Sequence, residues 1–137
     1  QSSRESAVRI KLNVLKEAVA GRRIIMIDDS IVRGTTSALI VNMLRDAGAR
    51  EVHVRISAPP FLHPCYFGTD IPSEDQLIAH GHTVEEIRDM IGADSLSYLK
   101  MERLQEMACS RSICTACFSG KYPIEPPVED IRGSYDK

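Results

Sequence analysis

Apolar residues fall into runs and periodic stripes that predict alternating strands and helices. Ile24 to Ile27 form an unbroken apolar run, which is typical of a parallel-sheet strand covered on both faces. Glu51 to Ala58 alternates apolar and polar residues, so we expect a second strand with one less buried face. Between them, residues 37–47 have the periodicity of a helix. The expected apolar face of this helix is formed by Ile40, Val41, Leu44 and Ala47. A strand, a crossover helix and a parallel strand make a βαβ unit.

Turn and capping residues mark the remaining elements. Three further helices are predicted over residues 14–20, 83–91 and 97–108. Thr83 and Glu86 have the spacing of a capping box at the start of the second of these helices. Two stretches without periodicity, residues 61–72 and 119–137, are expected to be an irregular loop and a Pro-rich, charged strap with a frayed tail. The pattern predicts an α/β fold with a parallel sheet and flanking helices, followed by a helical and irregular C-terminal segment.

Length and charge narrow the class of protein. The chain has 137 residues, which is enough for one domain with a moderate core. Its formal net charge of −2 does not indicate a nucleic-acid partner. The sequence has neither an apolar run long enough to cross a bilayer nor a signal-peptide pattern, so we expect a cytoplasmic protein without a membrane partner. The chain opens at Gln1 in what reads as mid-domain sequence, and we expect a C-terminal fragment of a longer protein.

The segment after the first predicted strand suits a sugar phosphate. Asp28 and Asp29 end the strand, and carboxylates bind a ribose diol, a magnesium ion or both. The residues that follow offer hydroxyls, a guanidinium and backbone N–H groups, which suit phosphate oxygens. The expected phosphate site consists of Ser30, Ile31, Val32, Arg33, Gly34, Thr35 and Thr36. Either threonine can cap the next helix, whose positive end adds to the attraction of an anion.

These residues carry a resemblance to a known family. The segment I-D-D-S-I-V-R-G-T-T at 27–36 resembles the phosphoribosyl pyrophosphate (PRPP) motif of type I phosphoribosyltransferases. Arg33-Gly34 stands where others usually carry Thr-Gly, and this form resembles the glutamine PRPP amidotransferase (amidophosphoribosyltransferase) family in particular. Further stretches resemble the same family: K-L-N at 11–13, residues 58–72, I-A-H-G at 78–81 and I-G-A-D-S-L at 91–96.

The resemblance implies a fold, a reaction and partners. It implies a type I phosphoribosyltransferase-like sheet, with residues 1–97 as part of that domain and residues 98–137 as a C-terminal segment. The whole protein would form 5-phosphoribosylamine from PRPP and glutamine-derived ammonia, the first step of purine synthesis. Purine nucleotides would inhibit it, and its partners would be a glutaminase domain absent from this chain and further copies in a homo-oligomer.

The resemblance also assigns roles to residues. Asp28 and Asp29 would hold the ribose hydroxyls and Mg²⁺, and residues 30–36 would cradle the 5-phosphate. Arg9 and Lys11 would lie in a loop that folds over PRPP. No residue is assigned as catalytic, and the fragment alone is expected to be inactive. The alternative function is a PRPP- or nucleotide-binding regulatory module without turnover.

The cysteines leave several chemistries open. The chain contains Cys65, Cys109, Cys114 and Cys117. A C-x-x-C pair such as the last two binds zinc or an iron–sulfur cluster or exchanges thiols, and the spacing does not choose between them. The last three also have the C-x₄-C-x₂-C spacing of two-iron ferredoxins.

The family resemblance favours one of these chemistries. It implies a [4Fe–4S] cluster held by Cys65, Cys114 and Cys117 with a fourth cysteine outside this fragment. Cys109 is interpreted as a buried or free thiol, and zinc on the C-x-x-C pair is the alternative.

Overall fold

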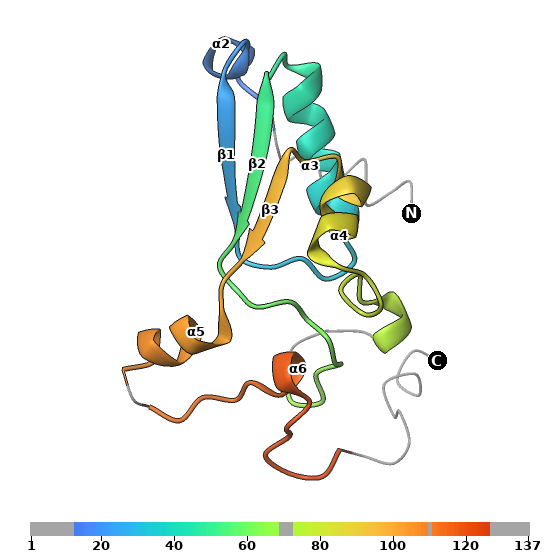
Figure 1. Ribbon diagram of the computed structural model, residues 1–137, viewed down its shortest axis with the longest axis vertical. Coiled ribbons are helices and arrows are strands. Elements are labelled where there is room, and N and C mark those ends of the chain that lie inside the picture. Colours follow the sequence, from blue (N-terminus) through green and yellow to red (C-terminus); the bar gives the residue numbers. More distant parts are fainter. Residues whose placement is uncertain (1–12, 69–72, 110, 127–137) are drawn as a thin grey trace.

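The computed structural model describes residues 13–68, 73–109 and 111–126, and these form an open sheet with helices beside it (Figure 1). The strands are β1 (Arg23–Asp28), β2 (Glu51–Ile56) and β3 (Ser95–Tyr98). They lie in the order β1-β2-β3, and both pairings are parallel. The predicted α/β class is therefore confirmed, while Arg9, Lys11 and the end of the tail lie outside the described residues.

Helices connect the strands and continue beyond them. They are α2 (Lys16–Val19), α3 (Thr35–Asp46), α4 (Val84–Ile91), α5 (Met101–Met107) and α6 (Ala116–Ser119), with a 3-10 turn η1 (Glu74–Gln76). α3 is the crossover between β1 and β2, as predicted, and it packs against α4. No helix in the described part of the chain is both long and apolar enough to cross a membrane.

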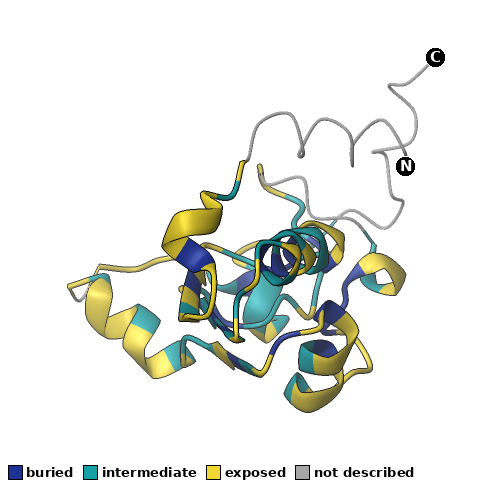
Figure 2. Cartoon of the chain, turned by 90° about the horizontal axis from the view of Figure 1, so that it is seen from above, coloured by how far each residue is buried: buried dark blue, intermediate teal, exposed yellow. Residues whose placement is uncertain are grey.

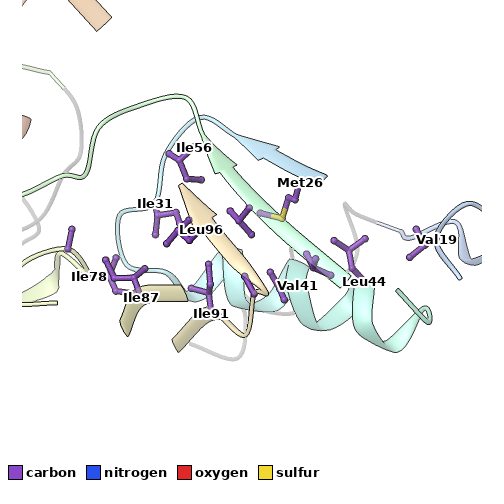
Figure 3. Packing of buried hydrophobic residues seen from close by; sticks show 14 residues of the cluster. Val19, Met26, Ile31, Val41, Leu44, Ile56, Ile78, Ile87, Ile91 and Leu96 are labelled. Atoms are coloured by element: carbon purple, nitrogen blue, oxygen red, sulfur yellow. The ribbon is translucent and has the colours of Figure 1, made fainter. Parts of the chain in front are cut away.

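The core lies between the sheet and the pair α3 and α4 (Figure 3). Val52, Val54 and Ile56 alternate along β2 and are buried, while the residues between them are half-buried, as the alternating pattern predicts. Val41 and Leu44 of α3 face these side chains from the helix layer. Buried residues thus gather in the interior, and the outer turns of the helices are exposed (Figure 2).

The prediction that β1 is covered on both faces is wrong for the described residues. Met26 is buried against the core, but Ile25 and Ile27 are 66% and 75% exposed. β1 is an edge strand of the sheet, and α3 and α4 cover only the side that Met26 faces. An unbroken apolar run thus occurs here on a strand with one open face, because the run alone does not say which faces are packed.

The predicted helix over residues 97–108 also needs correction. Residues 95–98 form β3, and α5 begins only at Met101. Ser95 and Leu96 of β3 pair with His53 and Val54 of β2. The predicted domain division after residue 97 falls inside this strand and stays a prediction. The backbone of this stretch is fixed by pairing with β2, and tertiary context of this kind overrides helix propensity.

Local capping chemistry was predicted well for α4 and wrongly for α3. Thr83 Oγ1 accepts the Glu86 N–H, and the Glu86 carboxylate accepts the Thr83 N–H, which confirms the capping box. By contrast, α3 begins after Gly34 in the left-handed conformation, and no side chain caps it. Among the described residues, the first N–H groups of α3 therefore have neither an intrahelical acceptor nor a side-chain cap.

Asp94 joins several elements at the amino-terminal end of the sheet. Its Oδ2 accepts the Val52 N–H at the start of β2 and lies 2.7 Å from Nη2 of Arg45 in the last turn of α3. The hydrogen bond from Val52 and the neighbouring Arg45 guanidinium together lower the pKa of Asp94. One carboxylate thus joins α3, β2 and the segment that leads into β3.

We expect Asp94→Ala to lower the free energy of unfolding by about 1–2 kcal/mol at pH 7, since the ion pair is partly exposed and screened. Because the folded-state pKa of Asp94 is lowered, its stabilisation is present above the ordinary value of 3.8 and is lost as pH falls through the folded value. Urea denaturation of both proteins from pH 7 to pH 2 should show that the difference in free energy of unfolding between wild type and Asp94→Ala becomes smaller in acid.

Asp46→Ala is the matched control, because Asp46 is exposed and forms no ion pair within the described residues. It should change the free energy of unfolding by less than about 0.5 kcal/mol. If Asp94→Ala lowered the free energy of unfolding by the same amount at every pH, the stabilising role of the Asp94 carboxylate would be contradicted.

Candidate functional site

The predicted phosphate segment leaves the sheet at the carboxyl end of β1. Asp28 is the last residue of that strand, and its backbone carbonyl accepts the Ser57 N–H at 3.0 Å, just beyond the end of β2. Ligands of open parallel sheets bind beyond the carboxyl ends of the strands. The strand pairing thus carries the acid pair to the edge where a ligand site is expected.

The two carboxylates at this edge are held by local hydrogen bonds. Asp28 Oδ1 accepts the Asp29 N–H at 2.9 Å, and Asp29 Oδ1 accepts the Ser30 hydroxyl at 3.0 Å. Asp28 is half-buried and Asp29 is exposed. Each carboxylate keeps a second oxygen that could accept from a sugar hydroxyl or bind a hard cation.

The loop after Asp29 presents backbone donors. Its hydrogen bonds within the described residues use the Asp29 N–H, the Ser30 hydroxyl and the carbonyls of Val32 and Gly34, and none uses an N–H group of residues 31–36. Gly34 adopts φ +79°, which an L side chain rarely adopts, and α3 begins immediately after it. N–H groups without an acceptor in the described part of the chain, at the positive end of a helix of 12 residues, suit an anion.

The side chains of this loop divide between core and solvent. Ile31 is 2% exposed and packs in the core, so only its backbone is available to a ligand. Arg33, Thr35 and Thr36 are exposed, and Arg33 forms no ion pair within the described residues. A guanidinium and two hydroxyls are therefore open to solvent in the same segment as these N–H groups, and their role in binding a phosphate stays a prediction.

Sequence reasoning missed the residue that packs beneath this loop. Ile78 lies just after η1, is 8% exposed, and donates its N–H to the Val32 carbonyl at 2.8 Å. The available signal was the short apolar run Leu77-Ile78-Ala79, all of it buried. Its periodicity was too short to assign, and its partner is distant in sequence.

Three of the cysteines meet in a second region. Cys117 lies in α6, and its carbonyl accepts the N–H groups of Leu62 and His63, both at 3.0 Å. The Tyr122 hydroxyl donates to the Pro64 carbonyl at 2.9 Å. These bonds, together with contact between the rings of Phe61 and Phe118, hold the loop that carries Cys65 against α6.

The environment of Cys117 fits this arrangement. Burial first, and then the neighbouring thiols of Cys65 and Cys114, raise the pKa of its thiol to about 11. Cys109 is exposed, and its thiol donates to the Met107 carbonyl, so the expectation of a free thiol fits it better than that of a buried one. No group of three or more His, Cys, Asp or Glu side chains in the described residues has the arrangement of a metal site. The thiols adjoin without forming a closed ligand set.

Three histidines, His53, His63 and His82, have partners within the fold. His53 contacts Ser95 and Glu51 on the open side of the sheet, each at 2.9 Å. His63 lies 2.9 Å from Glu74 of η1, and His82 Nδ1 lies 3.0 Å from the Ile78 carbonyl.

A groove of about 580 Å³ lies elsewhere, beside the end of β3 and the start of α5. Pro59, Tyr98, Lys100 and Phe118 are among its lining residues, and none of residues 28–36 lines it. The Tyr98 hydroxyl is buried without a hydrogen-bond partner in the described residues. The phosphate loop is therefore not part of this groove.

The open parallel sheet, the acid pair at its carboxyl edge and the N–H-lined loop define a type I phosphoribosyltransferase-like α/β protein. The solved structure of glutamine PRPP amidotransferase from Bacillus subtilis, complexed with ADP and GMP, superposes with a TM-score of 0.79 and 50% sequence identity. The alignment covers 94% of this chain and 30% of that chain. A second solved structure, described as the allosteric regulatory enzyme of purine biosynthesis, superposes with the same TM-score. That alignment covers 29% of the second protein's chain.

Curated relatives agree with the structural comparison. Amidophosphoribosyltransferase from Archaeoglobus fulgidus is 54% identical over 96% of this chain, and the Bacillus subtilis enzyme is 53% identical over 91%. Amidophosphoribosyltransferase 2, chloroplastic, from Arabidopsis thaliana is 46% identical over 99%. No family model matches the chain. The chain belongs to the amidophosphoribosyltransferase family, and it spans between 25% and 30% of the length of these relatives.

The contact between the Cys65 loop and α6 can be tested through one hydroxyl. We expect Tyr122→Phe to speed the reaction of the Cys117 thiol with a thiol reagent about fivefold in metal-free protein, because a net hydrogen bond of about 1 kcal/mol no longer opposes local opening. The measurement is mass-spectrometric detection of alkylation at Cys117.

Tyr98→Phe is the matched control, since it removes a hydroxyl that has no partner in the described residues. It should leave the alkylation rate of Cys117 unchanged. Equal rates for the two variants would show that the Tyr122 hydrogen bond does not hold this contact.

Proposed function

We propose that this chain supplies the PRPP-binding loop of an amidophosphoribosyltransferase. The observation that supports this most is the loop between β1 and α3, whose backbone donors at residues 31–36 have no acceptor within the described residues and follow the acid pair of Asp28 and Asp29. Donors at one end and carboxylates at the other suit a ribose that carries a phosphate. A bare phosphate site would gain nothing from the two carboxylates.

In the proposed reaction, ammonia released from glutamine attacks C1 of PRPP. The C1–N bond forms while the C1–O bond to pyrophosphate breaks, the pyrophosphate leaves with the bonding electrons, and the attacking nitrogen loses a proton to solvent. C1 passes through an oxocarbenium-like state, so catalysis consists mainly of positioning and of charge stabilisation. No residue of this chain needs to act as a general base, because ammonia is itself a good nucleophile.

Each part of the site has a role in this proposal. Residues 30–36 hold the 5-phosphate through backbone N–H groups, hydroxyls and the Arg33 guanidinium. Asp28 and Asp29 accept hydrogen bonds from the ribose hydroxyls and hold Mg²⁺. The ion, when bound, would neutralise charge on the pyrophosphate. Pyrophosphate itself needs donors outside these residues, which agrees with a chain that spans less than a third of its relatives.

Nucleotide binding at the same loop is a second candidate function. The solved Bacillus subtilis relative is described as complexed with ADP and GMP. A nucleoside monophosphate carries the same ribose and 5-phosphate as PRPP, so the same donors can hold it. We infer competition between purine nucleotides and PRPP, while a cytoplasmic location and a homo-oligomer remain predictions.

The cysteine region is proposed to hold a [4Fe–4S] cluster through Cys65, Cys114 and Cys117, with one more thiolate from elsewhere. The support is the set of donors: three thiols lie on two segments that backbone hydrogen bonds hold together. A cubane needs one thiolate for each iron, so the thiols must draw closer than they lie here. When bound, the cluster would cross-link the C-terminal segment to the Cys65 loop.

Replacing Asp28 and Asp29 together with Ala in the complete protein should lower PRPP-dependent formation of phosphoribosylamine at least about a hundredfold. The circular dichroism spectrum should not change, because neither carboxylate belongs to the core. The exposed Asp46→Ala serves as control and should keep full activity. Activity that survives the double replacement would refute the role of the acid pair.

Cys114→Ser should remove iron and its visible absorption from the complete protein purified without oxygen, and it should lower thermal stability because ligation couples to folding. Cys109→Ser, the control, should keep both iron and absorption. Metal analysis by mass spectrometry decides the outcome. Zinc without iron in the wild-type protein, or an unchanged spectrum in Cys114→Ser, would rule out the proposed ligand set.

A further inference from the structure

Gly34 is one of the residues through which the phosphate loop contacts the core. A β-carbon built on Gly34 would lie 2.4 Å from Cδ1 of Ile78, a distance that real β-carbons essentially never show. The Ile78 side chain therefore occupies the space that any larger residue would need at position 34. Ile91 closes the same space, with Cγ2 3.7 Å from the built β-carbon. Both isoleucines belong to the core cluster (Figure 3).

Ile78 is held from three directions. Its N–H donates to the Val32 carbonyl at 2.8 Å, its carbonyl faces Nδ1 of His82 at 3.0 Å, and its side chain is 8% exposed. A residue fixed in this way can impose a conformation on the loop that it contacts. By contrast, the other hydrogen bonds of the loop within the described residues are local: those of Asp29 and Ser30, and that of the Gly34 carbonyl, which accepts the Ala38 N–H at 2.9 Å.

The hydrogen bond from Ile78 decides which backbone dipoles the loop presents to a ligand. In a trans peptide the C=O of one residue and the N–H of the next point in opposite directions. No described peptide bond is cis. Because the Val32 carbonyl is directed at Ile78, the Arg33 N–H points away from Ile78, and a carbonyl that would repel an anion is kept out of the site.

We propose that Ile78 is a positioning residue for the phosphate site, which sets the conformation of residues 32–34 without touching the substrate. It acts through the hydrogen bond to Val32 and through the side chain that fills the space beside Gly34. The assignment of a ligand to this loop rests on the proposed function, whereas the contact between Ile78 and the loop does not.

A size exchange between the two residues tests the proposal in the complete protein. Gly34→Ala introduces the clash with Ile78 Cδ1, and adding Ile78→Val removes that atom while keeping the Ile78 backbone. Gly21→Ala is the matched control, since Gly21 has φ +71° but no atom within 4 Å of a built β-carbon. It carries the cost of a left-handed Ala without a clash.

Calorimetric titration with PRPP and Mg²⁺ gives the first readout. Gly34→Ala should weaken PRPP binding at least about tenfold, and the double variant should recover at least about threefold of that loss. Gly21→Ala should bind PRPP within about threefold of wild type. The proposal is overturned if Gly34→Ala binds PRPP as tightly as Gly21→Ala, or if the double variant binds no better than Gly34→Ala.

Trypsin cleavage after Arg33 gives a readout that needs no ligand. Arg33 is exposed, and Gly34→Ala and the double variant share the same scissile bond. If Ile78 governs the loop, Gly34→Ala should be cut at least about threefold faster than the double variant. Equal rates overturn the proposal. A wild-type protein that binds no PRPP, together with unequal cleavage rates, would refute the proposed function and leave the role of Ile78 standing.

Discussion

The pairing of β1 with β2 is the constraint on which the candidate site depends. Asp28 pairs with Ile56 at the last position of both strands, and Ser57 continues the pairing with a hydrogen bond to the Asp28 carbonyl. β2 is in turn held between two neighbours and against α3, so the point where the chain leaves the sheet is fixed. A loop that starts from a fixed point needs only a few further contacts to keep one shape, which is why binding loops are built on rigid scaffolds.

The segment from Glu74 to His82 brings the two candidate sites into one framework. At its start, Glu74 contacts His63 on the loop that carries Cys65. Further on, Ile78 packs beneath Gly34, and His82 supports Ile78 just before α4 begins. The thiol region and the phosphate loop therefore share one connecting segment, although the sequence places Gly34 and Cys117 far apart.

Local sequence chemistry predicted those features whose partners are close in the chain. The capping box of Thr83 and Glu86 is a contact within one helical turn, and the acid pair follows its strand directly. β3 was missed because its short segment forms a strand only through pairing with β2. The exposure of Ile25 was missed for a related reason, since an apolar run reports hydrophobicity and not which elements cover it.

The candidate site divides in the same way. Residues 28–36 form one continuous segment, so a motif could identify all of them. Ile78 belongs to the site because it contacts the loop from a distant part of the sequence. How closely it packs against Gly34 is shown by the 2.4 Å between Ile78 Cδ1 and a β-carbon built on Gly34. Whether the three thiols could adjoin was likewise a question of tertiary structure, which the spacing of C-x-x-C leaves open.

The open side of β1 carries a cost for a chain of these residues on its own. As an edge strand, β1 offers backbone groups that lack a neighbour among the described strands, and Ile25 and Ile27 add two apolar side chains on the same stretch. Charged residues are the usual protection of such an edge, and here Arg23 is already engaged with Glu51 at 2.6 Å. Strand-to-strand aggregation is therefore the main hazard in preparing this segment by itself, and low protein concentration is the physical remedy.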